Sequence, residues 1–309
     1  MTERHHDVRP DAAGDSATVD APAPAGHRSH DPRAVLDRPA PPPDAELRYG
    51  ADPEHVADLR QPGLSAGPAR PLVLVVHGGF WRAEFDRRHT GPLAADLADR
   101  GYPVVQLEYR RTGQPGGGWP GTLDDVAAGL AALPALAEAA LPAGRMAPGP
   151  PILLGHSAGG HLAVWAALRA PARVRGVLAL APVLDLADAH RRDLDGGAVA
   201  ALLGGGPADV PDRYAAADPV RSGPPGTRTS IVHGTLDRQV PVEQSRRYAA
   251  TAAGGPGVDL RFVELPECEH FAVIDPLSRA WPVVLAELDW LAGSSAGSSG
   301  GIDVASPSR

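Results

Sequence analysis

The sequence predicts an α/β domain built on a mostly parallel, doubly wound sheet. Short apolar segments rich in Val, Leu and Ile alternate along the chain with longer helical patterns. This alternation is typical of strands that are joined by crossover helices. Two of the apolar segments end in glycine-containing loops that carry His or Ser, at residues 77–79 and 155–159. We therefore expect the residues that carry chemistry to lie at the carboxyl ends of the strands.

Eight strands are expected from apolar runs that are bounded by turn residues. The expected strands are residues 46–49, 55–60, 72–76, 102–109, 151–154, 174–180, 230–232 and 260–265. The first two are short and are expected to form antiparallel strands at the edge of the sheet. The other six should form its parallel part.

Helices are expected on both faces of the sheet, where helical patterns separate the strands. They cover residues 84–100, 123–140, 160–169, 242–253 and 277–291. Thr122 is a candidate N-cap, and Asp124 and Asp125 favour the first turn of the helix that follows. Residues 183–228 break this rhythm with short helical pieces, glycines and prolines. They form either a small cap insertion over the site or plain connecting structure.

Composition divides the chain into three segments. Residues 1–45 are rich in Pro, Ala, Asp, Arg and His without apolar periodicity, which predicts a disordered N-terminal segment. Residues 46–292 carry the α/β pattern and have a length suited to one catalytic domain. Residues 293–309 are rich in Gly and Ser and are expected to form a flexible C-terminal tail.

Charge and composition argue against several classes of function. The chain has 37 acidic and 29 basic residues, a net charge of −8, and no basic patch that predicts nucleic-acid or membrane binding. No apolar run reaches membrane-spanning length, and the N-terminus lacks the apolar core of a signal peptide. The single cysteine, Cys268, excludes an internal disulfide and favours a cytoplasmic location. Neither a metal-ligand spacing nor a phosphate-binding glycine motif is present, so no metal and no cofactor are expected.

The clearest chemical motif is Gly-His-Ser-Ala-Gly at residues 155–159. It lies between a predicted strand and a predicted helix, so Ser157 stands at the apex of a sharp turn. Such a turn strains the serine backbone and leaves room only for very small residues two positions before and after it. The same Gly-x-Ser-x-Gly pattern surrounds Ser65 and Ser295, but neither has a strand before it and a helix after it. We therefore predict that Ser157 is the nucleophile.

A serine nucleophile needs a histidine base, and the histidine needs a carboxylate that fixes its tautomer. When the serine sits on such a turn, the acid and then the histidine follow it along the chain, each after a strand. Asp237 follows the strand 230–232, and His270 follows the strand 260–265. Asp185, after the preceding strand, is the one serious alternative acid.

The tetrahedral intermediate of acyl transfer carries an oxyanion that needs preorganised N–H donors. One donor is expected from the backbone of Ala158, directly after the nucleophile. The second is expected from the loop after residue 77, with Gly79 favoured and Gly78 or Phe80 as competitors. The candidate pocket residues, which are equally compatible with ordinary core, are Trp81, Tyr109 and Trp119. The histidines that flank these motifs are expected to be structural hydrogen-bonding groups: His77, His156, His161 and His233.

Four motifs together resemble one protein family. The motifs are His-Gly-Gly-Phe-Trp at 77–81, Gly-His-Ser-Ala-Gly-Gly-His-Leu-Ala at 155–163, His-Gly-Thr-Leu-Asp-x-x-Val-Pro at 233–241 and Glu-His-Phe at 269–271. They are similar to those of the α/β-hydrolases that include hormone-sensitive-lipase-like carboxylesterases and kynurenine formamidases (arylformamidases). The resemblance covers about residues 46–292. It implies the α/β-hydrolase fold, a triad of Ser157, Asp237 and His270, and an oxyanion hole at the His77 loop. Phe80-Trp81, in place of the third glycine of the esterase form, is closer to the formamidase form.

These observations predict a serine hydrolase that cleaves carboxylic esters of small to medium substrates through an acyl-enzyme intermediate. Two alternatives use the same triad, namely an arylformamidase acting on N-formylkynurenine-like aryl formamides and an acyltransferase. A non-catalytic binding protein is disfavoured because all three triad residues are present. The expected partner is a small-molecule ester or amide, and the expected state is a monomer or a homodimer.

Overall fold

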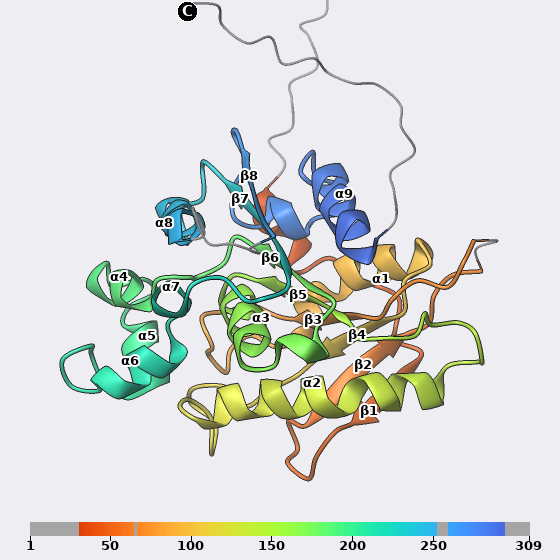
Figure 1. Cartoon of the computed structure of the whole chain (residues 1–309), viewed down its shortest axis with the longest axis horizontal. Coiled ribbons are helices and arrows are strands. Elements are labelled where there is room, and N and C mark those ends of the chain that lie inside the picture. Colours follow the sequence, from red (N-terminus) through yellow and green to blue (C-terminus); the bar gives the residue numbers. More distant parts are fainter. Residues whose placement is uncertain (1–30, 65–66, 252–258, 294–309) are drawn as a thin grey trace, which may run out of the picture. The chain divides into compact units, whose positions relative to one another are not determined.

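The computed structural model describes residues 31–64, 67–251 and 259–293 of the chain. An eight-stranded sheet runs through the unit Pro32–Arg309, with the strand order β1-β2-β4-β3-β5-β6-β7-β8 (Figure 1). Strand β2 pairs antiparallel with β1 and β4, and every other pairing is parallel. This arrangement confirms the predicted doubly wound, mostly parallel sheet with an antiparallel edge.

The strands agree with their predicted positions to within a few residues. They are β1 (Ala45–Arg48), β2 (Val56–Arg60), β3 (Val73–Val76), β4 (Val104–Leu107), β5 (Ile152–His156), β6 (Gly176–Leu180), β7 (Arg228–Gly234) and β8 (Leu260–Leu265). The long α-helices are α1 (Gly91–Asp99), α2 (Gly121–Ala140), α3 (Ala158–Arg169), α8 (Glu243–Thr251) and α9 (Trp281–Ala292). The predicted helix over 84–100 is shorter than expected, because its first part forms the 3-10 helix η2 (Arg87–Thr90).

The two faces of the sheet pack against different helices (Figure 1). Along β3, Val73 and Val75 belong to the core that contains α1 and α9, whereas Leu74 and Val76 belong to the core that contains α2 and α3. Side chains of a strand point alternately to its two faces, so a strand with helices on both sides must be apolar throughout. This explains why the central strands read as continuous apolar runs rather than as alternating ones.

The predicted insertion, residues 183–228, lies between β6 and β7 except for Arg228, which begins β7, and it contains four short helices. They are α4 (Leu186–Arg191), α5 (Ala198–Leu203), α6 (Pro211–Ala217) and α7 (Pro219–Ser222). The insertion is fixed to α3, because His161 donates from Nε2 to the carbonyl of Ala217 at 2.9 Å and Trp165 donates from Nε1 to the carbonyl of Ala216 at 3.0 Å. Its role as a cap over the site stays a prediction.

Thr122 was predicted to be an N-cap, and the structure shows a different role. Helix α2 begins at Gly121, so Thr122 lies inside its first turn. The Thr122 hydroxyl donates to the carbonyl of Arg110 at 2.5 Å and accepts from the N–H of Gly118 at 3.0 Å. It therefore holds the loop before the helix rather than capping the helix itself.

The predicted disorder of residues 1–45 is wrong for residues 32–44. This segment, which we call the strap, begins with the 3-10 helix η1 (Pro32–Val35) and runs into β1. Val35 is completely buried, and the guanidinium of Arg38 forms two hydrogen bonds with the buried carboxylate of Asp275. A composition poor in apolar residues concealed these long-range contacts. Residues 1–30 and 294–309, with the predicted tail and Ser295, lie outside the described residues, as does Ser65.

Two glycines make the turn from β5 into α3 sterically possible. A Cβ atom on Gly155 would lie 2.2 Å from the carbonyl oxygen of Gly159. A Cβ atom on Gly159 would lie 2.0 Å from the carbonyl oxygen of Val76, at the end of β3. The sequence-based expectation that only very small residues fit on either side of Ser157 is therefore confirmed.

Replacing Gly159 with alanine is expected to destabilise the protein. The added methyl group must push apart two backbone segments, which places the loss of unfolding free energy at the upper end of overpacking costs, about 3 kcal/mol. The matched control is Gly226→Ala, where an added Cβ meets no atom within 4 Å. Urea denaturation of both variants measures the difference. Equal stability of the two variants would contradict the close contact at the turn.

Candidate active site

Ser157 stands at the apex of the turn between β5 and α3. Its backbone has φ 56° and ψ −119°, a conformation that a non-glycine residue rarely adopts. The strain is maintained by the surrounding structure, because the N–H of Ser157 donates to the carbonyl of Leu180 on β6 at 2.8 Å. The residue is only 2% exposed. The fold thus holds the hydroxyl in a fixed, nearly enclosed position at the carboxyl end of the sheet.

Asp237 and His270 meet at the same end of the sheet. Asp237 follows β7, His270 follows β8, and the ring Nδ1–H donates to Asp237 Oδ2 at 2.6 Å. The other carboxylate oxygen, Oδ1, accepts the N–H groups of Gln239 and Val240 at 2.8 Å each. Because an ionised carboxylate can only accept, the proton of a neutral His270 ring resides on Nδ1. Its Nε2 is then free to accept a proton.

A second histidine keeps Asp237 ionised. The Nε2–H of His233 donates to Asp237 Oδ2 at 3.1 Å, while His233 Nδ1 accepts from the hydroxyl of Ser245 at 2.7 Å. Burial by itself raises the pKa of Asp237, but the hydrogen bonds from His233 and His270 outweigh burial and lower it well below its usual range. Asp237 therefore carries its negative charge throughout the physiological pH range.

His156, the residue before Ser157, links the turn between β5 and α3 to the loop that carries His270 after β8. Its Nε2–H donates to the carbonyl oxygen of His270 at 3.0 Å, and the two ring centroids are 4.6 Å apart. Burial, with a smaller contribution from His270, lowers the pKa of His156 well below its usual value, so this ring is neutral. Among the described residues, Ser157 Oγ and the His270 ring share no hydrogen bond. Catalytic hydrogen bonds are often long in ligand-free enzymes and tighten when substrate binds.

Asp185, the alternative acid, has other partners. It is the N-cap of α4, where its Oδ1 accepts the N–H of Asp188 at 2.8 Å. Its Oδ2 accepts from the guanidinium of Arg247 at 2.8 Å. Within the described part of the chain, Asp185 makes no contact with His270. The geometry thus favours Asp237 as the partner of the base.

The loop after β3, residues 77–81, lies against the turn between β5 and α3. A Cβ atom on Gly78 would lie 2.9 Å from the carbonyl oxygen of His156 and 3.1 Å from Ser157 Cβ, so the approach favours glycine. Gly79, Phe80 and Trp81 have φ values of 106°, 46° and 58°, which turn the backbone sharply. The N–H groups of Gly79, Phe80 and Ala158 donate to no other described residue. Free N–H groups beside a nucleophile are what an oxyanion hole requires. Which of Gly78, Gly79 and Phe80 provides the second donor stays a prediction.

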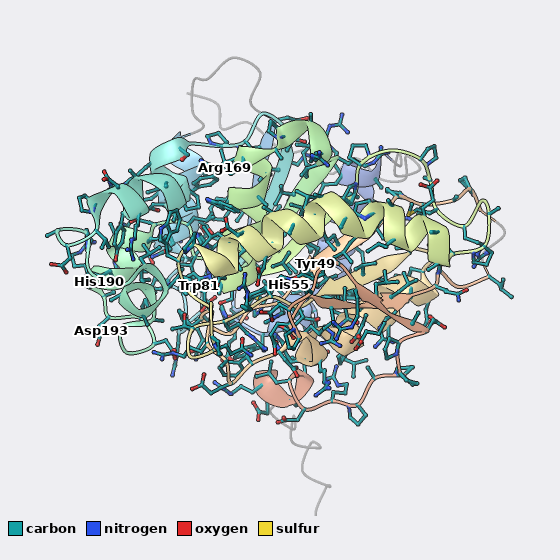
Figure 2. All side chains as sticks on the ribbon, turned by 90° about the horizontal axis from the view of Figure 1, so that it is seen from below. Tyr49, His55, Trp81, Arg169, His190 and Asp193 are labelled. Carbon is teal, nitrogen blue, oxygen red and sulfur yellow. The ribbon has the colours of Figure 1, made fainter. Side chains whose placement is uncertain are left out.

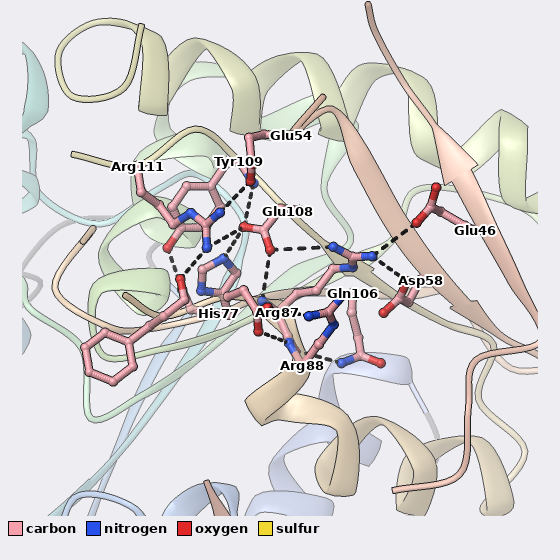
Figure 3. Close-up of polar contacts among 12 residues, drawn as sticks. Glu46, Glu54, Asp58, His77, Arg87, Arg88, Gln106, Glu108, Tyr109 and Arg111 are labelled. Atoms are coloured by element: carbon pink, nitrogen blue, oxygen red, sulfur yellow. Dashed lines mark hydrogen bonds and ion pairs between the residues drawn. The ribbon is translucent and has the colours of Figure 1, made fainter. Parts of the chain in front are cut away.

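A buried charge network that the sequence analysis missed supports this loop (Figure 3). His77 donates from Nε2 to Glu108 Oε1 at 2.8 Å, and Glu108 Oε2 accepts the N–H of Arg87 at 3.0 Å. Burial raises the pKa of Glu108, but its interactions with His77, Arg111 and the N–H of Arg87 outweigh burial and lower the pKa to about 2. The available signal was Glu108, an acidic residue directly after β4, a strand whose only polar residue is Gln106.

Two of the three candidate pocket residues prove to be core residues. Trp81 and Tyr109 are completely buried, so neither lines an open pocket in this structure. Figure 2 places Trp81 inside the molecule, where its ring meets that of His161 edge-to-face at 5.3 Å. Tyr109 stacks on His77 at 4.3 Å, and its hydroxyl donates to the carbonyl of His77. Both rings lie on the core side of the loop 77–81. Trp119 is partly buried against the same core.

The insertion contacts the outer side of this loop. Arg82, directly after Trp81, donates from Nε to Asp195 Oδ2 at 2.5 Å and from Nη2 to the carbonyl of Gly196 at 3.1 Å. Asp193, which is labelled with His190 in Figure 2, lies two residues before this contact on the outside of the insertion. The insertion is therefore fixed to the residue that follows the loop 77–81.

The described residues form neither a cluster that could bind a metal ion nor a reactive thiol. No group of three or more His, Cys, Asp or Glu residues in the described part of the chain is arranged to hold a metal ion. Burial raises the pKa of Cys268 to about 11, so its side chain is an unreactive thiol. Of the helices that the structure describes, none combines the length and the apolarity needed to cross a membrane.

Two relatives from Mycobacterium tuberculosis match most of the chain. Esterase LipQ is 28% identical over 274 residues, which is 80% of this chain and 61% of LipQ. LipM is 27% identical over 273 residues, which is 81% of this chain and 61% of LipM. The chain thus spans about three fifths of the length of these curated relatives.

Solved structures of the same fold include two esterases. Esterase B from Lactobacillus rhamnosis is 21% identical with a TM-score of 0.65, covering 85% of this chain and 90% of that one. A carbohydrate esterase from gut microbiota is 18% identical with a TM-score of 0.66, covering 80% of this chain and 96% of that one. The structural similarity to these two esterases shows that the chain has the α/β-hydrolase fold.

A protein-family model matches residues 58–251, a segment that runs from within β2 to the end of α8 and includes the loop 77–81, the turn at Ser157 and Asp237. The match covers more than half of the chain. The chain belongs to the BD-FAE family.

Proposed function

We propose that the protein is a serine hydrolase that cleaves carboxylic esters of small to medium size. The observation that carries this proposal is the 2.6 Å hydrogen bond between His270 and a charged Asp237, at the same end of the sheet as the strained Ser157. This is the constellation that activates a serine hydroxyl. The name of the relative LipQ, an esterase, supports the choice of an ester as substrate. A cytoplasmic location is part of the same proposal.

In the proposed two-step reaction, each of these groups has a role. Ser157 Oγ attacks the ester carbonyl while His270 Nε2 takes the hydroxyl proton. The N–H of Ala158 and one N–H of the loop 78–80 bind the oxyanion of the tetrahedral intermediate. Collapse of the intermediate breaks the C–O bond, and His270 returns its proton to the departing alcohol. Water then attacks the acyl-enzyme in the same way and releases the carboxylic acid and free Ser157.

The two alternative activities differ from ester hydrolysis in one step each. An arylformamidase expels an aryl amine rather than an alcohol, and an acyltransferase passes the acyl group to an added acceptor instead of water. We expect a series of para-nitrophenyl esters to be hydrolysed with a higher kcat/KM than N-formylkynurenine. Product analysis with added alcohols should give mainly free acid. A higher kcat/KM for N-formylkynurenine would assign the chain to the formamidases instead.

Removing the nucleophile should abolish both catalysis and covalent labelling. We expect Ser157→Ala to lose all reaction with a fluorophosphonate probe and to lower kcat by about 10⁵- to 10⁶-fold, because no other hydroxyl is activated by His270. Ser222→Ala, at an exposed serine on α7, is the control and should label like the wild type. In-gel fluorescence and ester hydrolysis measure the two effects. Undiminished labelling of Ser157→Ala would contradict the proposal.

The two aspartates provide a test of the acid. Asp237→Asn should lower kcat by about 10⁴-fold, because the amide favours the wrong tautomer of the histidine that it contacts. Asp185→Asn should leave kcat within about twofold and cost at most about 1 kcal/mol of stability, since asparagine keeps the helix cap and only the ion pair with Arg247 is lost. Steady-state kinetics and urea denaturation separate the two effects. The reverse pattern would make Asp185 the acid.

A further inference from the structure

The orientation of the His270 ring depends on packing as well as on hydrogen bonding. Among the described residues, the ring forms one hydrogen bond, from Nδ1 to Asp237. That bond fixes one end of the ring but leaves its plane free to turn. Two other rings contact it, His156 with centroids 4.6 Å apart and Phe271 edge-to-face at 4.9 Å. The direction in which Nε2 points therefore depends on these two neighbours.

The two neighbouring rings are held in different ways. His156 is buried at the end of β5, so the sheet fixes its position. Phe271 is only partly buried and lies in the loop after β8, directly before the 3-10 helix η4 (Ala272–Ile274). A side chain on a loop is more mobile than one on a central strand. The contacts of Phe271 therefore decide how firmly the His270 ring is held.

The strap provides one of these contacts. The guanidinium of Arg33, in η1, lies over the ring of Phe271 at 5.1 Å from its centroid. A cation in this position is attracted by the negative face of an aromatic ring. The Phe271 ring thus contacts Arg33 of the strap as well as the ring of His270. It forms a physical link between the two.

The strap also holds the backbone that follows Phe271. Val35 belongs to the same hydrophobic core as the buried residues of η4. Arg38 donates from Nη1 and Nη2 to the two carboxylate oxygens of Asp275, a residue that is completely enclosed apart from 1% of its surface. A bidentate pair of this kind holds both partners in one geometry. The strap is therefore joined to residues 271–275 by an aromatic contact, a shared core and an ion pair.

The other end of the strap is anchored to the edge of the sheet. Arg60 on β2 donates from Nη1 to the carbonyl of Pro41 at 2.7 Å, and the N–H of Asp44 donates to the carbonyl of Leu59 at 2.9 Å. The run Pro41–Pro43 has restricted φ angles, which leaves the segment few conformations. The strap is thus a stiff connection between the edge strands and the loop after β8.

We propose that the strap positions the histidine base of the reaction, with Arg33 and Phe271 as positioning residues. The inference rests on the proposed function, because it takes His270 to be the base. Arg33 holds the Phe271 ring, and the Phe271 ring keeps Nε2 of His270 in the direction from which it accepts the proton of Ser157. Neither side chain takes part in the chemistry or binds the ester. Both therefore act on kcat and not on KM.

Arg33→Ala tests the proposal in the full-length protein. Arg33 is exposed, so urea denaturation should give nearly the wild-type midpoint. With para-nitrophenyl butyrate, an uncharged ester, we expect kcat to fall about fivefold, as the loss of one cation–π contact allows, while KM is unchanged. Arg33→Lys keeps a cation over the ring and should recover most of the lost kcat. A purely structural role would move the midpoint and leave kcat as it is.

Phe271→Leu removes the ring that links Arg33 to His270 but keeps an apolar side chain. We expect kcat to fall at least about tenfold, because both ring contacts are lost. Phe271→Tyr, which keeps the ring, should retain most of the activity. In the Phe271→Leu protein, Arg33→Ala should have no further effect, since the ring under the guanidinium is gone. This double-mutant cycle separates the proposed link from a general effect of the Arg33 charge.

Arg70→Ala is the matched control. Its guanidinium lies over the ring of Tyr102 at 4.5 Å and pairs with Asp289, but it stands before β3, at the amino end of the parallel strands. We expect its kcat to equal that of the wild type. An unchanged kcat in Arg33→Ala, or an equal loss in Arg70→Ala or in the Phe271→Leu background, would overturn this inference alone. A wild type that neither hydrolyses the ester nor reacts with a fluorophosphonate would overturn the proposed function and this inference with it.

Discussion

The candidate active site depends on one close contact between backbone segments, where the β5–α3 turn meets the end of β3. No side chain separates the two segments, because an added Cβ on Gly159 would lie only 2.0 Å from the carbonyl oxygen of Val76. The contact holds Ser157 in its strained conformation, and it also brings Gly78 against Ser157 Cβ. The same packing therefore positions Ser157 and the loop that carries Gly78 and Gly79.

The buried titratable groups around this contact are of two kinds, neutral histidines and charged carboxylates. Burial lowers the pKa of His156 well below its usual value and that of His161 to about 4, so both rings are neutral and hold backbone carbonyls. Asp237 and Glu108 are kept charged, because hydrogen bonds and neighbouring charges outweigh the cost of their burial. Asp237 accepts hydrogen bonds from His233 and His270, and Glu108 accepts one from His77, at the start of the loop 77–81.

The sequence was sufficient to predict the sheet and to place the residues of the candidate triad, because these features are local. Asp237 and His270 each follow a short apolar strand, and the turn at Ser157 needs glycine on both sides. Features that depend on distant partners were not predictable. The strap is held by Arg38 and Asp275, which are 237 residues apart, and nothing near Arg38 in the sequence indicates this contact. The role of aromatic residues such as Trp81 could not be predicted, because the sequence does not show whether their rings face the core or a pocket.

The central claim is that Ser157 attacks a carbonyl whose oxyanion is bound by the N–H of Ala158 and of the loop after His77. A crystal structure of the full-length protein inactivated by an alkyl phosphonate tests it most directly. We expect phosphorus bonded to Ser157 Oγ, with the phosphoryl oxygen about 3 Å from the nitrogen of Ala158 and from that of Gly78, Gly79 or Phe80. A phosphonate attached to another residue, or an oxygen that points away from these nitrogens, would contradict the account.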